Sequence, residues 1–155
     1  MSNPNLSEIL AESFWNGWIP SDLSRDFMKA IDLSLLGPKA LDEIRYVVEN
    51  WPQTYLGGRK QGAIYQIEGL RITLEQAHEQ AMQVEKPQHE AIAYLLMALQ
   101  EGLKAMICSC TAVITAMECN DYAIMHCGLR SAEKAAETLK VVYDGTHYSA
   151  PDAVM

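Results

Sequence analysis

The chain has 155 residues, 49% of them hydrophobic and 21% charged, a composition typical of one folded domain and not of a disordered chain. Its net charge of −8 is spread evenly: the first 58 residues hold 4 basic and 8 acidic side chains, and the remainder holds 8 and 12. Without clustered Lys and Arg we expect no nucleic-acid binding, and an acidic chain favours a basic protein partner.

The sequence shows neither the pattern of a secretory signal nor that of a membrane span. Residues Met1 to Glu8 lack a basic region followed by an apolar run, so we expect no secretory signal and a cytoplasmic protein. The apolar run from Ala91 to Leu99 is interrupted by Gln100, Glu101 and Lys104, so we expect no membrane span. The four cysteines lack the spacing of a disulfide framework and are predicted to be free thiols.

Three short helices are predicted in residues 1–58. The first follows a cap at Asn3 or Asn5 and ends near Asn16-Gly17. The second runs from Ser21 to Leu35 and ends before Gly37-Pro38, and the third runs from Pro38 to Trp51. Their inward residues recur at helical spacing: Leu6, Ile9, Leu10, Phe14; Leu23, Phe27, Ala30 or Ile31, Leu35; Leu41, Ile44, Val48, Trp51. Residues 52–58 show no period and end in two glycines, which indicates a boundary.

Three long helices are predicted next, from Lys60 to Glu85, from Gln88 to Cys119 and from Asp121 to Tyr143. Each has an apolar stripe whose members alternate between spacings of 4 and 3 residues, which is typical of packed helices. Pro87 is expected in the first turn of the central helix, which would be about 48 Å long. The stripes are Ala63, Ile67, Leu70, Leu74, Ala77, Ala81, Val84; Ile92, Leu96, Leu99, Leu103, Met106, Cys110, Val113, Met117; and Tyr122, Met125, Leu129, Ala132, Ala136, Leu139, Tyr143.

These elements predict an all-α fold, an antiparallel helical bundle with three long C-terminal helices and about three short N-terminal helices. Residues 1–155 would form a single domain, in which 1–58 cap the bundle of 59–144 and 145–155 form a loose tail. Small residues line both flanks of the central helix: Ala98, Ala105 and Ala112 on one, Gly102, Ser109 and Ala116 on the other. Either the fold surrounds this helix, or one of its faces pairs across a dimer two-fold axis.

Signals for chemistry are weak. Glu75 and His78 have the Glu-x-x-His spacing of di-iron helical bundles, but the motif occurs once and equally fits a polar helix surface. Cys108 and Cys110 would point about 200° apart on one helix, so they cannot hold one zinc ion together. Cys127 beside His126 is the one candidate for an activated thiol, and Cys119 is assigned no role. We predict no metal and no cofactor.

Catalytic motifs are also missing from the sequence. No Gly-x-Ser-x-Gly elbow and no glycine-rich phosphate loop occurs. Glu118 and Asp121 have the Glu-x-x-Asp spacing of some magnesium-dependent helical hydrolases, but the accompanying paired-glutamate motif is absent, so both read as helix-end residues. We predict no catalytic residues.

Large aromatic residues near the N-terminal helix ends are the remaining candidates. Trp15, Trp18, Trp51 and Tyr55 either pack in the core or contact a partner. Our function hypothesis is an acidic interaction protein, such as an inhibitor, an immunity-type protein or an adaptor. The alternative is a helical bundle that holds a small ligand or metal between its helices, possibly as an enzyme.

Overall fold

A computed structural model describes residues 25–146 of the chain, without the side chain of residue 146. The prediction of an all-α fold is confirmed, since these residues form helices and turns and contain no strand. The predicted helix over residues 6–14 lies outside the described residues, as does most of the predicted tail. The elements are α2 (Arg25–Ile31), η1 (Asp32–Leu35), α3 (Leu36–Glu49), α4 (Trp51–Leu56), α5 (Lys60–Met82), α6 (Glu90–Glu118) and α7 (Tyr122–Thr146).

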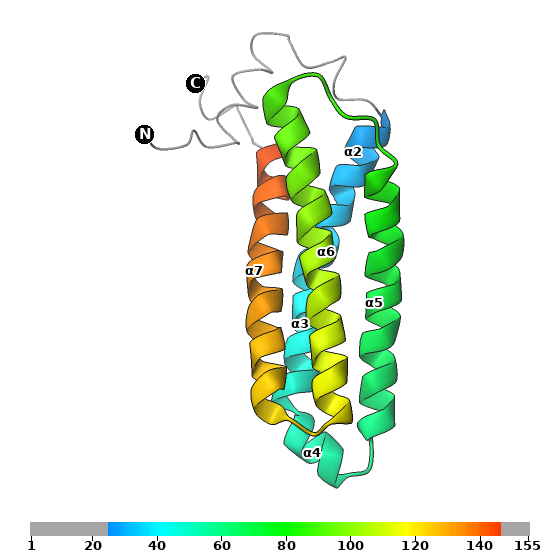
Figure 1. The fold of residues 1–155 in the computed structure, drawn as a ribbon, viewed down its shortest axis with the longest axis vertical. Helices are drawn as coiled ribbons and strands as arrows, with labels where there is room; N and C mark the ends of the chain where they lie inside the picture. The colour runs from blue at the N-terminus through cyan, green and yellow to red at the C-terminus, as the bar shows by residue number, and fades with distance from the viewer. Residues whose placement is uncertain (1–24, 147–155) are drawn as a thin grey trace, which may run out of the picture.

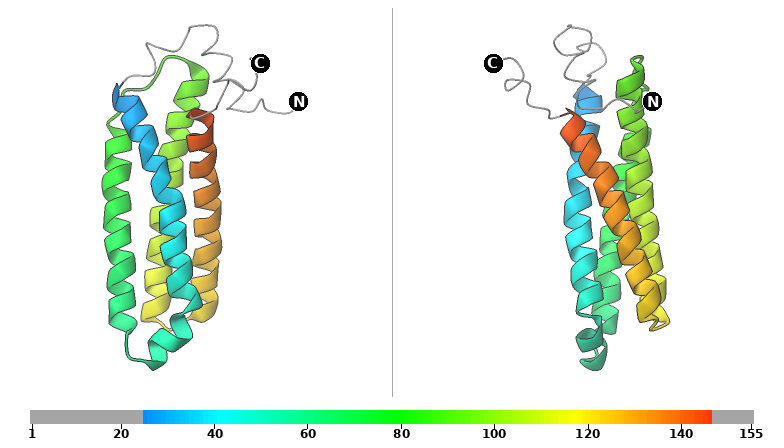
Figure 2. Two further views of the ribbon diagram at one scale, coloured as in Figure 1. Left: turned by 180° about the vertical axis from the view of Figure 1, so that it is seen from behind. Right: turned by 90° about the vertical axis from the view of Figure 1, so that its left-hand side faces the viewer.

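Four rods lie side by side in the described part of the chain (Figures 1 and 2). One rod is the consecutive run of α2, η1 and α3, and the others are α5, α6 and α7. Helix α6 packs between α5 and α7, and α3 packs mainly against α7. Helix α4 crosses one end of the rods, whereas the start of α2 and the end of α7 both lie at the opposite end.

The first rod differs from the sequence prediction, which placed a break at Gly37-Pro38. These two residues instead lie in the first turn of α3, where the missing amide hydrogen of Pro38 breaks no bond within that helix. Gly37 is required by packing, since a Cβ atom there would lie 2.9 Å from Leu139 Cδ1. The short 3₁₀ turn before α3 allows α2 and α3 to follow one another without a loop.

The predicted boundary over residues 52–58 is also partly wrong. Residues 51–56 form helix α4, with Pro52 in its first turn, where proline is well tolerated. The change of direction is confined to Gly57-Gly58, and Gly58 has a φ of +71°, a conformation that favours glycine. Gly57 and Gly58 therefore mark a turn, as the sequence predicted, whereas Pro52 marks the start of a helix.

The long helices differ from prediction mainly at their ends. Helix α5 ends at Met82, three residues early, and α6 begins at Glu90 because the His89 side chain caps it, accepting a hydrogen bond from Ala91 N at 3.2 Å. Pro87 therefore precedes α6 and does not enter its first turn. Helix α7 continues through the predicted stop at Asp144-Gly145.

The core follows the predicted central stripe. All eight of its members on α6 are buried, none more than 4% exposed. Helices α6 and α7 approach closely because each carries a glycine at their contact: a Cβ atom on Gly102 would lie 2.7 Å from Leu139 Cδ2, and one on Gly128 would lie 2.7 Å from Val113 Cγ2. The small-residue flank that contains Gly102 is thus covered by α7, whereas Ala105 on the other flank is exposed.

Helix α6 meets the length and composition criteria of a membrane span. The sequence had predicted no such helix, because Gln100, Glu101 and Lys104 interrupt its apolar run. Its most apolar 18-residue window has a mean hydropathy of 1.4, and 39% of that window is buried. The core helix of a water-soluble bundle meets the same criteria.

Candidate functional site: the α4 end

Helix α4 crosses the end of the molecule where α3 and α6 finish and where α5 and α7 begin (Figure 1). Two tight turns close this end. In the first, Gly58 N donates to Tyr55 O at 3.2 Å and Arg59 N donates to Thr54 O at 2.9 Å. These bonds satisfy the last carbonyl groups of α4, and α5 starts directly afterwards.

The second turn joins α6 to α7 with the same pair of bonds. Asn120 N donates to Met117 O at 3.2 Å and Asp121 N donates to Ala116 O at 2.9 Å, with Asn120 at a φ of +56°. Asp121 then caps α7, because its Oδ1 atom accepts a hydrogen bond from Ile124 N at 3.1 Å. The two turns are linked by Lys60 Nζ, which donates to the Glu118 carbonyl oxygen at 3.2 Å.

The aromatic residues predicted to bind a partner fall into different places. Trp51 is 4% exposed and belongs to the core, whereas Tyr55 on the next turn of α4 is 50% exposed. Their ring centroids are 6.2 Å apart, so Tyr55 rests against the buried indole. Trp15 and Trp18 lie outside the described residues.

Further large side chains are exposed at the same end, and sequence reasoning missed them. We call the following set the tyrosine-rich end: Tyr46, Tyr55, Leu56, Tyr65 and Tyr122. Leu56 is the most exposed, at 84%. Tyr122 was predicted to face inward but is 39% exposed, with its ring edge-on to that of His126 at a centroid distance of 4.4 Å.

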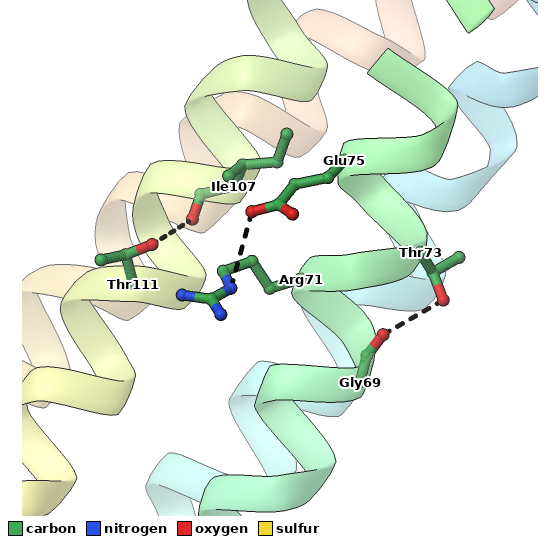
Figure 3. A network of polar contacts seen from close by, with 6 residues as sticks. All are labelled: Gly69, Arg71, Thr73, Glu75, Ile107 and Thr111. Carbon is green, nitrogen blue, oxygen red and sulfur yellow. Dashed lines mark hydrogen bonds and ion pairs between the residues drawn. The ribbon is translucent and has the colours of Figure 1, made fainter. Parts of the chain in front are cut away.

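The Glu75 and His78 motif lies on α5, away from this end. The Glu75 Oε1 atom is 3.6 Å from Arg71 Nε, one turn earlier on the same helix, on the side of α5 that faces α6 (Figure 3). Among residues 25–146 no group of three or more His, Cys, Asp or Glu side chains is placed to hold a metal ion.

The cysteines divide into one buried and three exposed thiols. Cys110 is fully buried, and this burial raises its pKa to about 12; Glu43 and Glu75 also raise the pKa, and Arg71 lowers it. Cys108, Cys119 and Cys127 are exposed. His126, the predicted activator of Cys127, has its ring against Tyr122.

Comparison of the chain with known protein families, curated proteins and solved structures finds no match. The function is therefore argued from the residues and their geometry alone.

Proposed function

We propose that this protein is a cytoplasmic protein–protein interaction module without catalytic chemistry, and that it binds its partner through the tyrosine-rich end. In this proposal the rods form an antiparallel bundle that acts as a rigid scaffold. One observation carries it: four tyrosines and Leu56 are exposed around a closed, hydrogen-bonded end. Tyrosine is enriched in the binding surfaces of proteins and among the residues that dominate their affinity.

Rigidity supports this choice of surface. Tyr55 rests on the buried Trp51, and the α4 backbone ends in a closed turn, so little side-chain or loop freedom remains to be lost on binding. A tyrosine ring also offers a large contact area with only two side-chain torsions to fix. We propose a basic partner, because the net charge of −8 would speed its association at low salt.

A matched pair of tyrosines tests the proposal. Tyr55 is 50% exposed at the α4 end, and Tyr94 on α6 is 52% exposed toward the other end. We expect Tyr55→Ala to weaken partner binding by about tenfold or more, as for a central interface residue, and Tyr94→Ala to leave it unchanged. Binding partners would be captured from the source lysate with each variant and quantified, then titrated individually.

Leu56→Asp provides a second variant, since an 84% exposed side chain contributes little to folding. It should retain the helical circular dichroism signal and still lose the partner. Equal retention of every captured protein by wild type, Tyr55→Ala and Leu56→Asp would exclude the tyrosine-rich end as the binding surface.

One observation favours the alternative of a ligand between the helices. Arg71 Nε is buried and has no hydrogen-bond acceptor among the described residues, the nearest carboxylate oxygen being 3.6 Å away on Glu75. A small anion between α5 and α6 would supply that acceptor. Native mass spectrometry of the purified protein, with elemental analysis for metals, tests this: a mass equal to the bare chain would reject it.

A further inference from the structure

A hollow of about 430 Å³ lies between the first half of α6 and the connection that joins α5 to α6. Its hydrophobic lining residues are Val84, Ala93, Tyr94, Leu96 and Met97. Tyr94 is 52% exposed and Met97 is 45% exposed, so the α6 wall of this α5–α6 hollow presents large apolar side chains to solvent. The hollow lies at the end opposite α4, away from the tyrosine-rich end, and is not used by the proposed function.

The walls of the α5–α6 hollow are held in place. Gln100, which lines it from α6, donates through Nε2 to the Ala81 carbonyl oxygen on α5 at 3.0 Å. Leu96 is 4% exposed and forms part of the floor. A surface that is already ordered loses little side-chain freedom on binding, which favours occupation of the hollow by a matching apolar segment.

A second hollow, of about 350 Å³, connects the α5–α6 hollow to the start of α2. It lies between α2 and the end of α5, two elements that contact each other at this end of the rods (Figure 1). Val84 lines both hollows, so they meet there, and Asp26, the second residue of α2, lines the far side. The segment that precedes Arg25 therefore joins the described fold beside this second hollow. Among the described residues, none from α7 lines either hollow, so the end of α7 does not lead into them.

Residues 1–24 lie outside the described residues, and their sequence has the pattern of a segment that needs a surface to cover it. The helix predicted over residues 6–14 has large apolar side chains within an arc of about 140°. These side chains are Leu6, Ile9, Leu10 and Phe14. Glu8 and Glu12 would lie on the opposite side, and Trp15 and Trp18 follow the helix. An amphipathic helix is stable in water mainly through burial of its apolar face, so this segment requires an apolar surface of its own.

We propose that residues 1–24 of the same chain occupy the α5–α6 hollow. The apolar face of the predicted helix lies against Tyr94 and Met97, and its two glutamates face solvent. Trp15 and Trp18 then pack within the chain, which is one of the two roles that the sequence left open for them.

The length of the connecting chain allows this placement. Ten residues, 15–24, separate Phe14 from Arg25, and they reach about 33 Å when extended. That length exceeds the roughly 20 Å of two interhelix spacings, from α2 past α5 to α6. Because the link is short, the local concentration of the segment is in the millimolar range, which favours it over a separate partner.

Tryptophan fluorescence tests the docking in the full chain, because Trp51 is 4% exposed and the other two tryptophans lie in residues 1–24. Acrylamide should quench the wild type weakly. Met97→Asp places a carboxylate under the apolar face of the segment, so it should release the segment and raise the quenching constant at least about twofold. Ile72→Asp is the matched control: Ile72 is 49% exposed on α5 outside both hollows, and its substitution should leave the quenching constant unchanged. Circular dichroism confirms that the rods remain folded in each variant.

Photo-cross-linking identifies what lies in the hollow. Benzoylphenylalanine in place of Tyr94 should form cross-links to residues 6–18, and the same group in place of Tyr65, in the tyrosine-rich end, should form none to that segment. The sample is an equal mixture of isotope-labelled and unlabelled protein. Mass spectrometry of the joined peptides then shows whether both parts come from one chain.

Wild-type fluorescence that is quenched as strongly as that of Met97→Asp would show that the segment does not dock in the hollow. Cross-links from position 94 that join labelled to unlabelled chains would place a second copy there, and the absence of any cross-link to residues 1–24 would leave the hollow to another occupant. Each of these results overturns the proposal. None of them affects the tyrosine-rich end, which Tyr55→Ala tests at the opposite end of the rods.

Discussion

Cys110 illustrates how burial determines the behaviour of a single residue. Its side chain is fully enclosed on the core side of α6, and enclosure is the main reason that its pKa rises from 9.0 to about 12. The thiol is therefore neutral at physiological pH and acts as a small apolar residue. Cys108, two residues earlier, points to solvent, as the helical period predicted.

We expect three thiols of the native protein to react with limiting iodoacetamide at pH 8 and Cys110 to react only after unfolding, because the reagent needs an accessible thiolate. Mass spectrometry of labelled peptides measures this at a series of times. Labelling of native Cys110 at the rate of Cys108 would contradict the burial.

Cys110 also makes stability depend on alkaline pH. The pKa of the Cys110 thiol is higher in the folded state, so the unfolded chain loses this proton at a lower pH. The contribution of Cys110 to the free energy of unfolding is therefore fully present below pH 9 and is lost as the pH rises from 9 toward 12. The loss should reach about 1 kcal/mol by pH 10. Urea unfolding of wild type and Cys110→Ala at pH 8 and 10 measures it, because other groups titrate equally in both proteins.

At the scale of elements, the turn between α6 and α7 is the most fully specified connection. Asn120 adopts a left-handed φ of +56°, and the neighbouring Asp121 caps the next helix. A three-residue sequence, Cys-Asn-Asp, thus ends one long helix and starts another. The sequence predicted this position because both residue types favour such ends.

Substitutions at this turn should separate its two contributions. We expect Asn120→Ala to lower the free energy of unfolding by about 1 kcal/mol because alanine is strained at positive φ, and Asn120→Gly to match or exceed wild type. Asp121→Ala should cost about 1 kcal/mol through loss of the cap. Urea denaturation followed by circular dichroism gives these values, and equal effects of Ala and Gly at position 120 would refute the assignment.

The elements also show where sequence reasoning succeeds and where it fails. The buried stripe of α6 was predicted in full, because a period of 3.6 residues is a local property. Gly37 was misread as a helix stop, since its role is to admit Leu139, a residue far along the chain. No local signal reveals such a contact.

The candidate site was predicted only in part, for the same reason. Tyr55 was named because it follows a helix-ending signal, but Trp51 beside it belongs to the core. Tyr46 and Tyr65 were missed because they lie on the outward faces of their helices, outside the predicted apolar stripes and away from a predicted helix end. Exposure of a large side chain depends on which neighbours cover it, and this is a tertiary property.

At the scale of the whole molecule, the tyrosine-rich end is separate from the groove of small side chains along α6 and α7. The tyrosine-rich end is built from residues near the turns, and the groove runs along the sides of α6 and α7.

Helix α2 begins at Arg25 and helix α7 ends at Thr146, and these two helix ends lie at the end of the molecule opposite α4 (Figure 1). A mechanical load applied across these two residues would therefore peel α2 and α3 away from α7 one turn at a time, starting where the load acts. Tethers at Leu56 and Thr146 would pull on opposite ends and break many contacts together. In single-molecule pulling, we expect the protein tethered at Arg25 and Thr146 to unfold at clearly lower force than the protein tethered at Leu56 and Thr146. The direction of tension, and not only the total stability, would then determine how this fold resists being pulled through a narrow pore.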